Sequence, residues 1–191
     1  MNRIPRDLSV SGSGRKVGGS SLLVRIGHQF TDMALLDLAL THCSLGGVHY
    51  ERLEFLGDAV LELIISDELY RSFPDWPEGR LSRMRSALVD RDALLITAQS
   101  WELASELKVG RGERTPDGVV RSPSIVVNAV EAVLGAIYLD AGIVAATKVV
   151  LAAWDTRLQT VGDDEVVDAK SRLQEWTQAR GWGTPGYVCS D

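Results

Sequence analysis

The stretch that decides the fold is Glu51-Arg-Leu-Glu-Phe-Leu-Gly-Asp58. It places the carboxylates of Glu51, Glu54 and Asp58 at positions i, i+3 and i+7, which fall on one face of a helix, within reach of a shared cation. The apolar residues around them recur with the period of a helix whose other sides pack into a core: Leu53, Phe55, Leu56, Val60, Leu61, Ile64 and Ile65. An acidic face beside a core is unfavourable unless something compensates its charge, so the segment predicts a site with a bound cation.

The rest of the chain also has helical periodicity, and no stretch has convincing period-two alternation. Thr31 or Asp32 can cap a helix over 32–40, and the Gly46-Gly47 break precedes the acidic helix. Turn residues separate the other segments, and 110–121 is the longest loop or a small hairpin. We therefore predict an all-α domain, with further helices over 78–86, 91–101, 124–139 and 143–160.

A second polar pair, Asn128 and Glu131, lies at i, i+3 in an apolar helical segment. Together with Glu54 and Asp58, it would present four oxygen-bearing side chains from two facing helices. Mg²⁺ prefers oxygen ligands and keeps several waters, so a few such side chains suffice to hold it. The alternatives are exposed acids on an amphipathic helix for the first cluster and a buried, satisfied polar pair for the second.

Taken together, the motifs resemble the ribonuclease III family of endonucleases, which cut double-stranded RNA with magnesium. Residues 51–62 (ERLEFLGDAVLE) resemble the family's signature helix, and 128–140 resemble its second acidic helix. The segments 40–44 (LTHCS) and 78–89 match as well, so the likeness spans roughly residues 22–158. It implies a helical endonuclease domain that works as a homodimer on duplex RNA, with Mg²⁺ as cofactor and Mn²⁺ able to substitute.

The resemblance also implies roles for individual residues. Glu54, Asn128 and Glu131 match the family's metal ligands, while Asp58 and Glu131 match the residues most essential to cleavage. Glu51 matches a supporting acidic position of the signature. One departure affects the site: the family usually has Asp where this chain has Asn128, which removes one negative charge and should weaken metal binding. The chain is then either an active natural variant or one impaired in cleavage.

Other residues are expected to contact the second subunit of the dimer or the RNA. By resemblance, Glu78 is a supporting residue that reaches the partner's site across the dimer interface, and Phe55 and Leu56 are dimer contacts. Recognition should follow the A-form shape of the duplex, with little reading of bases. Three arginines form a local basic surface that either contacts RNA or is a solvated helix face: Arg80, Arg83 and Arg85.

His42 and His49 invite a general-acid role, but metal-bound water can serve that purpose, so a packed or capping histidine is the favoured interpretation. The tryptophans at 101, 154 and 176 are expected in or near the core, because a stacking platform for single strands needs an open basic surface. Cys43 and Cys189 offer neither a disulfide framework nor a zinc spacing and should be reduced.

The bulk composition sets limits on the class of protein. The 191 residues are 45% apolar and carry a net charge of −6, which suits one domain or one domain plus part of another. The acidic balance argues mildly against a protein that coats nucleic acid. No apolar run approaches the length that spans a bilayer, and the N-terminus lacks the apolar region of a signal peptide. We expect a cytoplasmic protein with no membrane association.

Four segments are expected along the chain. Residues 1–21 are rich in Gly, Ser and basic residues and predict a mobile leader; 22–161 form the ribonuclease III catalytic domain; 162–168 form an acidic linker. Residues 169–191 resemble the first helix and strand of a double-stranded-RNA-binding domain of α/β type, and the remainder of such a domain is missing, so we expect a truncated module.

The sequence thus predicts an endoribonuclease that hydrolyses double-stranded RNA by a divalent-metal mechanism, in the processing of ribosomal and messenger RNA precursors. The rival from another class is a catalytically impaired or non-catalytic protein of the same fold that binds duplex RNA without cutting it. A second rival is a fragment that folds and dimerises but lacks useful affinity for RNA.

Overall fold

The computed structural model describes residues 19–161 and 180–181, and within them the chain is helical. The expected linker at 162–168 and nearly all of the expected leader and RNA-binding module lie outside this part, as do Trp176 and Cys189. The elements in chain order are α1 (Gly19–Ile26), α2 (Met33–Ala39), the 3₁₀ turn η1 (Cys43–Leu45), α3 (Glu51–Ser72), α4 (Glu78–Leu88), α5 (Arg91–Ser100), α6 (Leu103–Glu106), the 3₁₀ turn η2 (Arg111–Glu113) and α7 (Pro123–Thr160).

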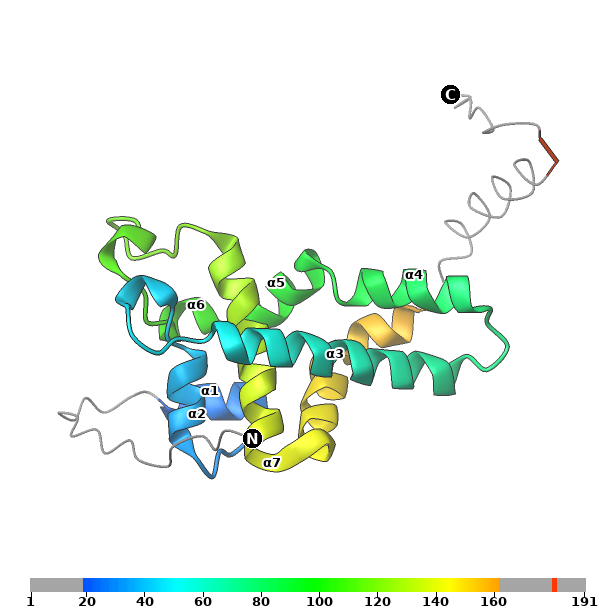
Figure 1. Ribbon diagram of the computed structural model, residues 1–191, viewed down its shortest axis with the longest axis horizontal. Helices are drawn as coiled ribbons and strands as arrows, with labels where there is room; N and C mark the ends of the chain where they lie inside the picture. The colour runs from blue at the N-terminus through cyan, green and yellow to red at the C-terminus, as the bar shows by residue number, and fades with distance from the viewer. Residues whose placement is uncertain (1–18, 162–179, 182–191) are drawn as a thin grey trace, which may run out of the picture.

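Helices α3 and α7 form the centre of the domain and share its most extensive contact (Figure 1). Helices α2 and α5 also pack on α7, and α4 packs along α3. The core side chains with almost no exposed surface come from these helices and include Leu61, Ile65, Val130, Ile137 and Trp154. Trp154 also donates a hydrogen bond from its indole nitrogen to the Leu88 carbonyl at 2.7 Å, which ties the end of α7 to the end of α4.

Short polar side chains set the beginnings of two helices. Asp32 precedes α2 and accepts a hydrogen bond from the Ala34 amide at 2.9 Å, and Asp90 does the same for α5 with the Ala93 amide at 2.8 Å. Each side chain satisfies a backbone donor that the helix leaves without a partner. Of the two caps offered by the sequence for α2, Asp32 is the one used.

Helix α7 changes direction at Gly142, whose φ of 79° and ψ of −177° are not helical. The parts on either side of Gly142 correspond to the two helices predicted over 124–139 and 143–160. Glycine adopts this conformation without the steric cost that a β-carbon would impose. The bend lets both parts of α7 lie against the rest of the domain (Figure 1).

Within the described residues, α7 is long and apolar enough by length and composition to cross a membrane. The expectation that no segment reaches this threshold was therefore wrong. The physical reason is its central position, since a helix surrounded by other helices is apolar on nearly every side. Half of its most apolar stretch is buried inside the domain.

The predicted helices over 78–86 and 91–101 are confirmed as α4 and α5. The sequence missed the single turn of α6, which follows Glu102 with its left-handed φ of 52°. The 110–121 segment is a loop containing η2 and a tight turn at Gly118, closed by one isolated bridge between Arg114 and Val120. Trp101 and Trp154 are buried, as expected.

Candidate active site

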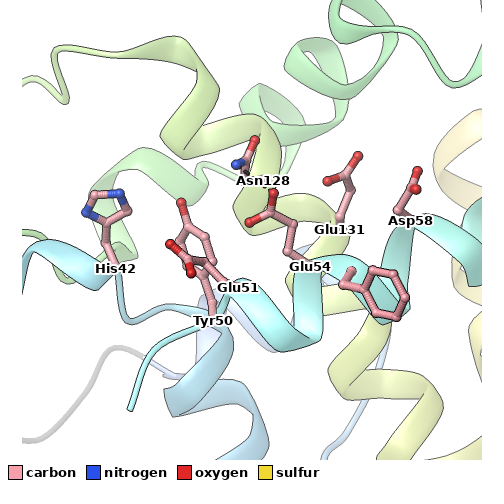
Figure 2. Close-up of a pocket in the computed structure, with 8 residues that line it drawn as sticks. His42, Tyr50, Glu51, Glu54, Asp58, Asn128 and Glu131 are labelled. Carbon is pink, nitrogen blue, oxygen red and sulfur yellow. Dashed lines mark hydrogen bonds between the residues drawn. The ribbon is translucent and has the colours of Figure 1, made fainter. Parts of the chain in front are cut away.

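The N-terminal part of α3, the segment before it and the first half of α7 surround an open pocket of about 640 Å³ (Figure 2). It brings together Glu51, Glu54, Asp58, Asn128 and Glu131, the five residues singled out from the two acidic motifs. The pocket lining contains four carboxylates and no Lys or Arg side chain. Its full lining is His42, Tyr50, Glu51, Glu54, Phe55, Asp58, Asn128 and Glu131.

Two glycines allow the acidic residues of α3 and α7 to meet. A β-carbon on Gly57 would overlap the Glu131 carbonyl oxygen and lie 2.6 Å from its carbonyl carbon. A β-carbon on Gly135 would likewise overlap the Leu53 carbonyl oxygen. The two helix backbones therefore approach more closely than any larger residue permits. This contact places Glu54 and Asp58, one turn apart on α3, opposite Glu131.

Asn128 and Glu54 are joined directly across the two helices. The Asn128 side-chain Nδ2 donates a hydrogen bond to Glu54 Oε1 at 2.8 Å, between residues 74 apart in sequence. Because an ionised carboxylate only accepts hydrogen bonds, this contact fixes which end of the amide faces Glu54. The bond stabilises the charged form of Glu54 and holds its side chain toward the pocket.

Burial and mutual repulsion raise the pKa of two of the carboxyls. Glu131 is affected most: burial, followed by the charges of Asp58 and Glu54, raises its pKa to about 7. Burial also raises the pKa of Glu54, with the hydrogen bond from Asn128 opposing it and the nearby charges of Glu51 and Asp58 adding to it. The negative charge of the pocket is therefore not balanced by the side chains that line it.

Tyr50 lines the pocket and was not recognised from the sequence. It is the residue before α3, is 2% exposed, and donates a hydrogen bond from its hydroxyl to the Ile125 carbonyl at 3.4 Å. Burial and the surrounding acidic groups raise the pKa of this phenol. The residue joins the start of α3 to the start of α7. Its position directly before the first acidic residue was the only signal that the sequence offered.

His42 combines the predicted capping role with a place in the pocket. Its side chain caps η1 by accepting a hydrogen bond from the Ser44 amide at 3.2 Å. The ring also lines the same pocket as the carboxylates (Figure 2). His49 does not line the pocket, and its Nδ1 lies 3.7 Å from Glu51 Oε2.

The remaining predicted residues lie on α4, away from the pocket lining. Glu78 is exposed and accepts a hydrogen bond from the Ser82 hydroxyl at 2.6 Å. The Arg80 guanidinium stacks 3.7 Å above the ring of Trp76, which in turn stacks on Phe73 with ring centres 3.9 Å apart. Arg80 thus packs on the turn between α3 and α4.

The other two arginines of this group also lie on α4. Arg85 Nη1 donates a hydrogen bond to the Ser66 hydroxyl at 3.2 Å, while the Arg83 side chain is exposed. Arg80 and Arg85 therefore make contacts within the domain, which argues against these two side chains standing free as a basic surface for RNA.

The pocket contains oxygen atoms of the type that bind divalent cations. Among the described residues, no three His, Cys, Asp or Glu side chains are gathered closely enough to hold an ion as they stand. In kind, the donors suit a hard cation: carboxylate oxygens from Glu54, Asp58 and Glu131, and an amide oxygen from Asn128. The uncompensated charge indicated by the raised pKa of Glu131 is the condition that a bound cation would relieve.

Solved structures with the same fold define the class of protein. The nuclease domain of Ribonuclease III from Campylobacter jejuni matches with a TM-score of 0.68 and 37% identity, covering 71% of this chain and 95% of that domain. In the Campylobacter domain, a region involved in dimer formation is structurally flexible. The described helices therefore have the fold of a helical nuclease domain.

Sequence comparison gives the family. A family model described as Ribonuclease-III-like matches residues 32–157. Ribonuclease 3 from Marinomonas sp. is 46% identical over 164 residues, and Ribonuclease 3 from Xylella fastidiosa is 48% identical over 165 residues; each alignment covers 85% of this chain and 72% of the relative. The chain belongs to the ribonuclease III family, and is an endoribonuclease of that type.

Proposed function

We propose that this enzyme hydrolyses phosphodiester bonds of double-stranded RNA with the help of Mg²⁺, for which Mn²⁺ can substitute. The observation that carries the proposal is the meeting of Glu54, Asp58 and Glu131 in a pocket without Lys or Arg, where burial and repulsion raise the pKa of Glu131 to about 7. Such a cluster is costly unless a cation occupies it.

Glu54, Glu131 and Asn128 are the residues that would hold the metal. When bound, Mg²⁺ activates a water for attack and stabilises negative charge on the phosphate and the leaving 3′ oxygen. Glu131 approaches from α7 and Glu54 from α3, so the close contact of the two helices sets the width of the site. Asp58 is exposed on the same face of α3, and its proposed role is to accept a hydrogen bond from the attacking water.

Asn128 supports two versions of this proposal. In the first, its amide oxygen serves as a neutral metal ligand and the enzyme is active with a weaker metal site. In the second, the hydrogen bond from Nδ2 to Glu54 persists and the chain binds duplex RNA with little or no cleavage. The orientation of the amide favours the second version, whereas the intact carboxylates at 51, 54, 58 and 131 favour the first.

The active form is proposed to be a homodimer that binds A-form RNA by its phosphates and 2′-hydroxyls. Support for the dimer comes from Phe55, whose side chain is 81% exposed on α3 directly beside the pocket. An exposed aromatic side chain at this place suits a protein–protein interface, where aromatic residues are enriched. Leu56, the second expected dimer contact, packs partly against the core. Roles in ribosomal and messenger RNA processing, and a cytoplasmic location, are proposed by analogy with the family.

Cleavage of long duplex RNA by the purified chain over a series of Mg²⁺ and Mn²⁺ concentrations tests the function. Glu131→Gln is the inactive control, and Glu62→Gln, an exposed position on α3 outside the pocket, is the matched one. Metal-dependent shortening that is lost in Glu131→Gln but kept in Glu62→Gln supports the nuclease. Duplex binding without cleavage at any metal concentration supports the non-catalytic alternative, and absence of both overturns the proposal.

A further inference from the structure

His42 lies at one end of the pocket, and Asp58 lies at the other (Figure 2). Among the eight lining side chains, four are carboxylates and His42 is the one that is able to carry a positive charge. RNA brings a phosphate group into this acidic surface, so a hydrogen-bond donor at the edge of the pocket has a physical use.

The hydrogen bonds of the His42 ring determine which nitrogen carries its proton. Nδ1 lies 3.2 Å from the Ser44 amide nitrogen and 2.8 Å from the Ser44 hydroxyl oxygen. An amide N–H can only donate, so Nδ1 is the acceptor of that contact. The neutral ring then carries its proton on Nε2. Nε2 itself lies 3.6 Å from Cys43 Sγ, and sulfur is a weak acceptor.

Two other side chains of the lining have hydrogens to donate, and each uses one of them within the protein. The Asn128 amide donates to Glu54 at 2.8 Å, and the Tyr50 hydroxyl donates to the Ile125 carbonyl at 3.4 Å. Of the lining groups with a single N–H or O–H to donate, the Nε2–H of His42 faces the weaker acceptor, a sulfur at 3.6 Å. It is therefore the group best suited to meet an acceptor on a bound ligand.

The segment that carries His42 is fixed by backbone contacts on both sides. The His42 amide donates to the Lys108 carbonyl at 2.9 Å, and the Tyr50 amide donates to the Thr41 carbonyl at 2.9 Å. The Ser44 hydroxyl, which contacts the ring, accepts a hydrogen bond from the Gly110 amide at 2.7 Å. Capping η1 requires only Nδ1, so the cap leaves Nε2 available while these contacts hold the ring in place.

We propose that His42 is a substrate-contacting residue whose Nε2–H donates a hydrogen bond to a phosphate oxygen of the RNA strand in the pocket. The inference rests on the proposed function, because it requires duplex RNA as the ligand. His42 thereby supplies a directional donor in a lining otherwise dominated by acceptors. It needs no change in the protonation of the ring.

Substitutions at position 42 separate substrate contact from capping. Asn and Asp are preferred cap residues that can accept the Ser44 N–H, but neither has a donor in the place of Nε2, and Asp adds a negative charge. Ala removes both the cap and the donor. Each variant is made in the full chain with Glu131→Gln, so that binding of a duplex RNA in Mg²⁺ is measured without cleavage, and thermal unfolding is measured in parallel.

The two possible roles of His42 predict different rankings of the variants in RNA affinity and in thermal stability. If His42 contacts RNA, affinity falls at least about tenfold in His42→Asn and His42→Ala and further in His42→Asp, while only His42→Ala loses thermal stability. If His42 is only a cap, affinity follows stability, so His42→Asn binds as the parent does, and the inference is overturned. A parent that does not bind duplex RNA at all overturns the proposed function itself, which is a distinct result.

Discussion

The amide of Asn128, at the position where the family resemblance leads us to expect Asp, donates a hydrogen bond to Glu54 at 2.8 Å across the α3–α7 contact. An Asp at 128 would place a second negative charge against Glu54. That pair would be stable only with a cation between the carboxylates or with one of them protonated.

Asn128→Asp should therefore make the metal-free protein less stable. It should also lower the Mg²⁺ concentration at which the enzyme cleaves RNA. We expect a loss of about 1–2 kcal/mol in unfolding free energy in EDTA, recovery of that loss by Mg²⁺, and cleavage at lower Mg²⁺ than the parent requires. Thermal unfolding and cleavage assays across a Mg²⁺ series measure both effects. The exchanged pair Asn128→Asp with Glu54→Gln is the control, because it restores an amide–carboxylate bond; an unchanged Mg²⁺ dependence in the single variant would refute the expectation.

Glu131 should make the metal-free protein less stable as the pH rises. The unfolded chain releases this proton near pH 4.5, whereas the folded chain keeps it until about pH 7. Between these values the folded state binds more protons, so its stability falls with increasing pH. After allowance for solvent screening we expect a change of about 1–2 kcal/mol.

Denaturant unfolding in EDTA from pH 4.5 to pH 7.5 measures this change. Glu131→Gln has no titrating group at the position and should show a smaller decline than the parent. Mg²⁺ at saturating concentration should also flatten the decline in the parent, because a bound cation favours the ionised carboxylate. Equal pH slopes for parent and Glu131→Gln would show that burial of this carboxyl has no energetic consequence.

Gly57→Ala should disrupt both stability and catalysis. Its β-carbon would overlap the Glu131 carbonyl oxygen, so α3 and α7 must separate. We expect a destabilisation of about 2–3 kcal/mol and a loss of cleavage of about 100-fold, because Glu54 and Asp58 move away from Glu131. Gly79→Ala on α4 is the control: its β-carbon would meet only Arg83 Nη1 at 3.7 Å, and the helix should gain up to about 1 kcal/mol. Similar losses at both positions would contradict the close-contact argument.

Phe55→Glu should separate the proposed dimer while leaving each subunit folded. The side chain is 81% exposed in the single chain, so its replacement removes no core contact of the monomer. Sedimentation velocity should show a shift from dimer to monomer, with little change in the thermal unfolding of the monomer. Val24→Glu on α1, where the side chain is 73% exposed, is the matched control and should leave the association state as it is. Dissociation by both variants, or by neither, would count against Phe55 as a dimer contact.

The sequence was sufficient for the main helices and for the acidic motifs because both depend on local spacing. The carboxylates of Glu54 and Asp58 lie one helical turn apart wherever the helix is placed. The same holds for Asn128 and Glu131. Family resemblance then related the two motifs, and the pocket does contain both of them.

Other features depended on contacts between distant segments. The sequence treated three arginines of α4 alike, whereas packing places Arg80 on Trp76 and joins Arg85 to Ser66. It also presented His42 as a cap or a packed residue, and the fold added a place in the pocket. A spacing pattern cannot reveal such partners, because they are far apart along the chain.

The sequence by itself therefore determined the main helices, the family and the acidic residues of the pocket, since periodicity and short motifs are properties of neighbouring residues. Only the tertiary structure decided how closely α3 and α7 approach each other at the pocket, and which carboxylates there have no balancing positive charge. The contact of Gly57 with the Glu131 backbone sets the distance between α3 and α7. The hydrogen bond from Asn128 to Glu54 and the burial of Glu131 follow from that distance, and they determine the charge that a cation would meet.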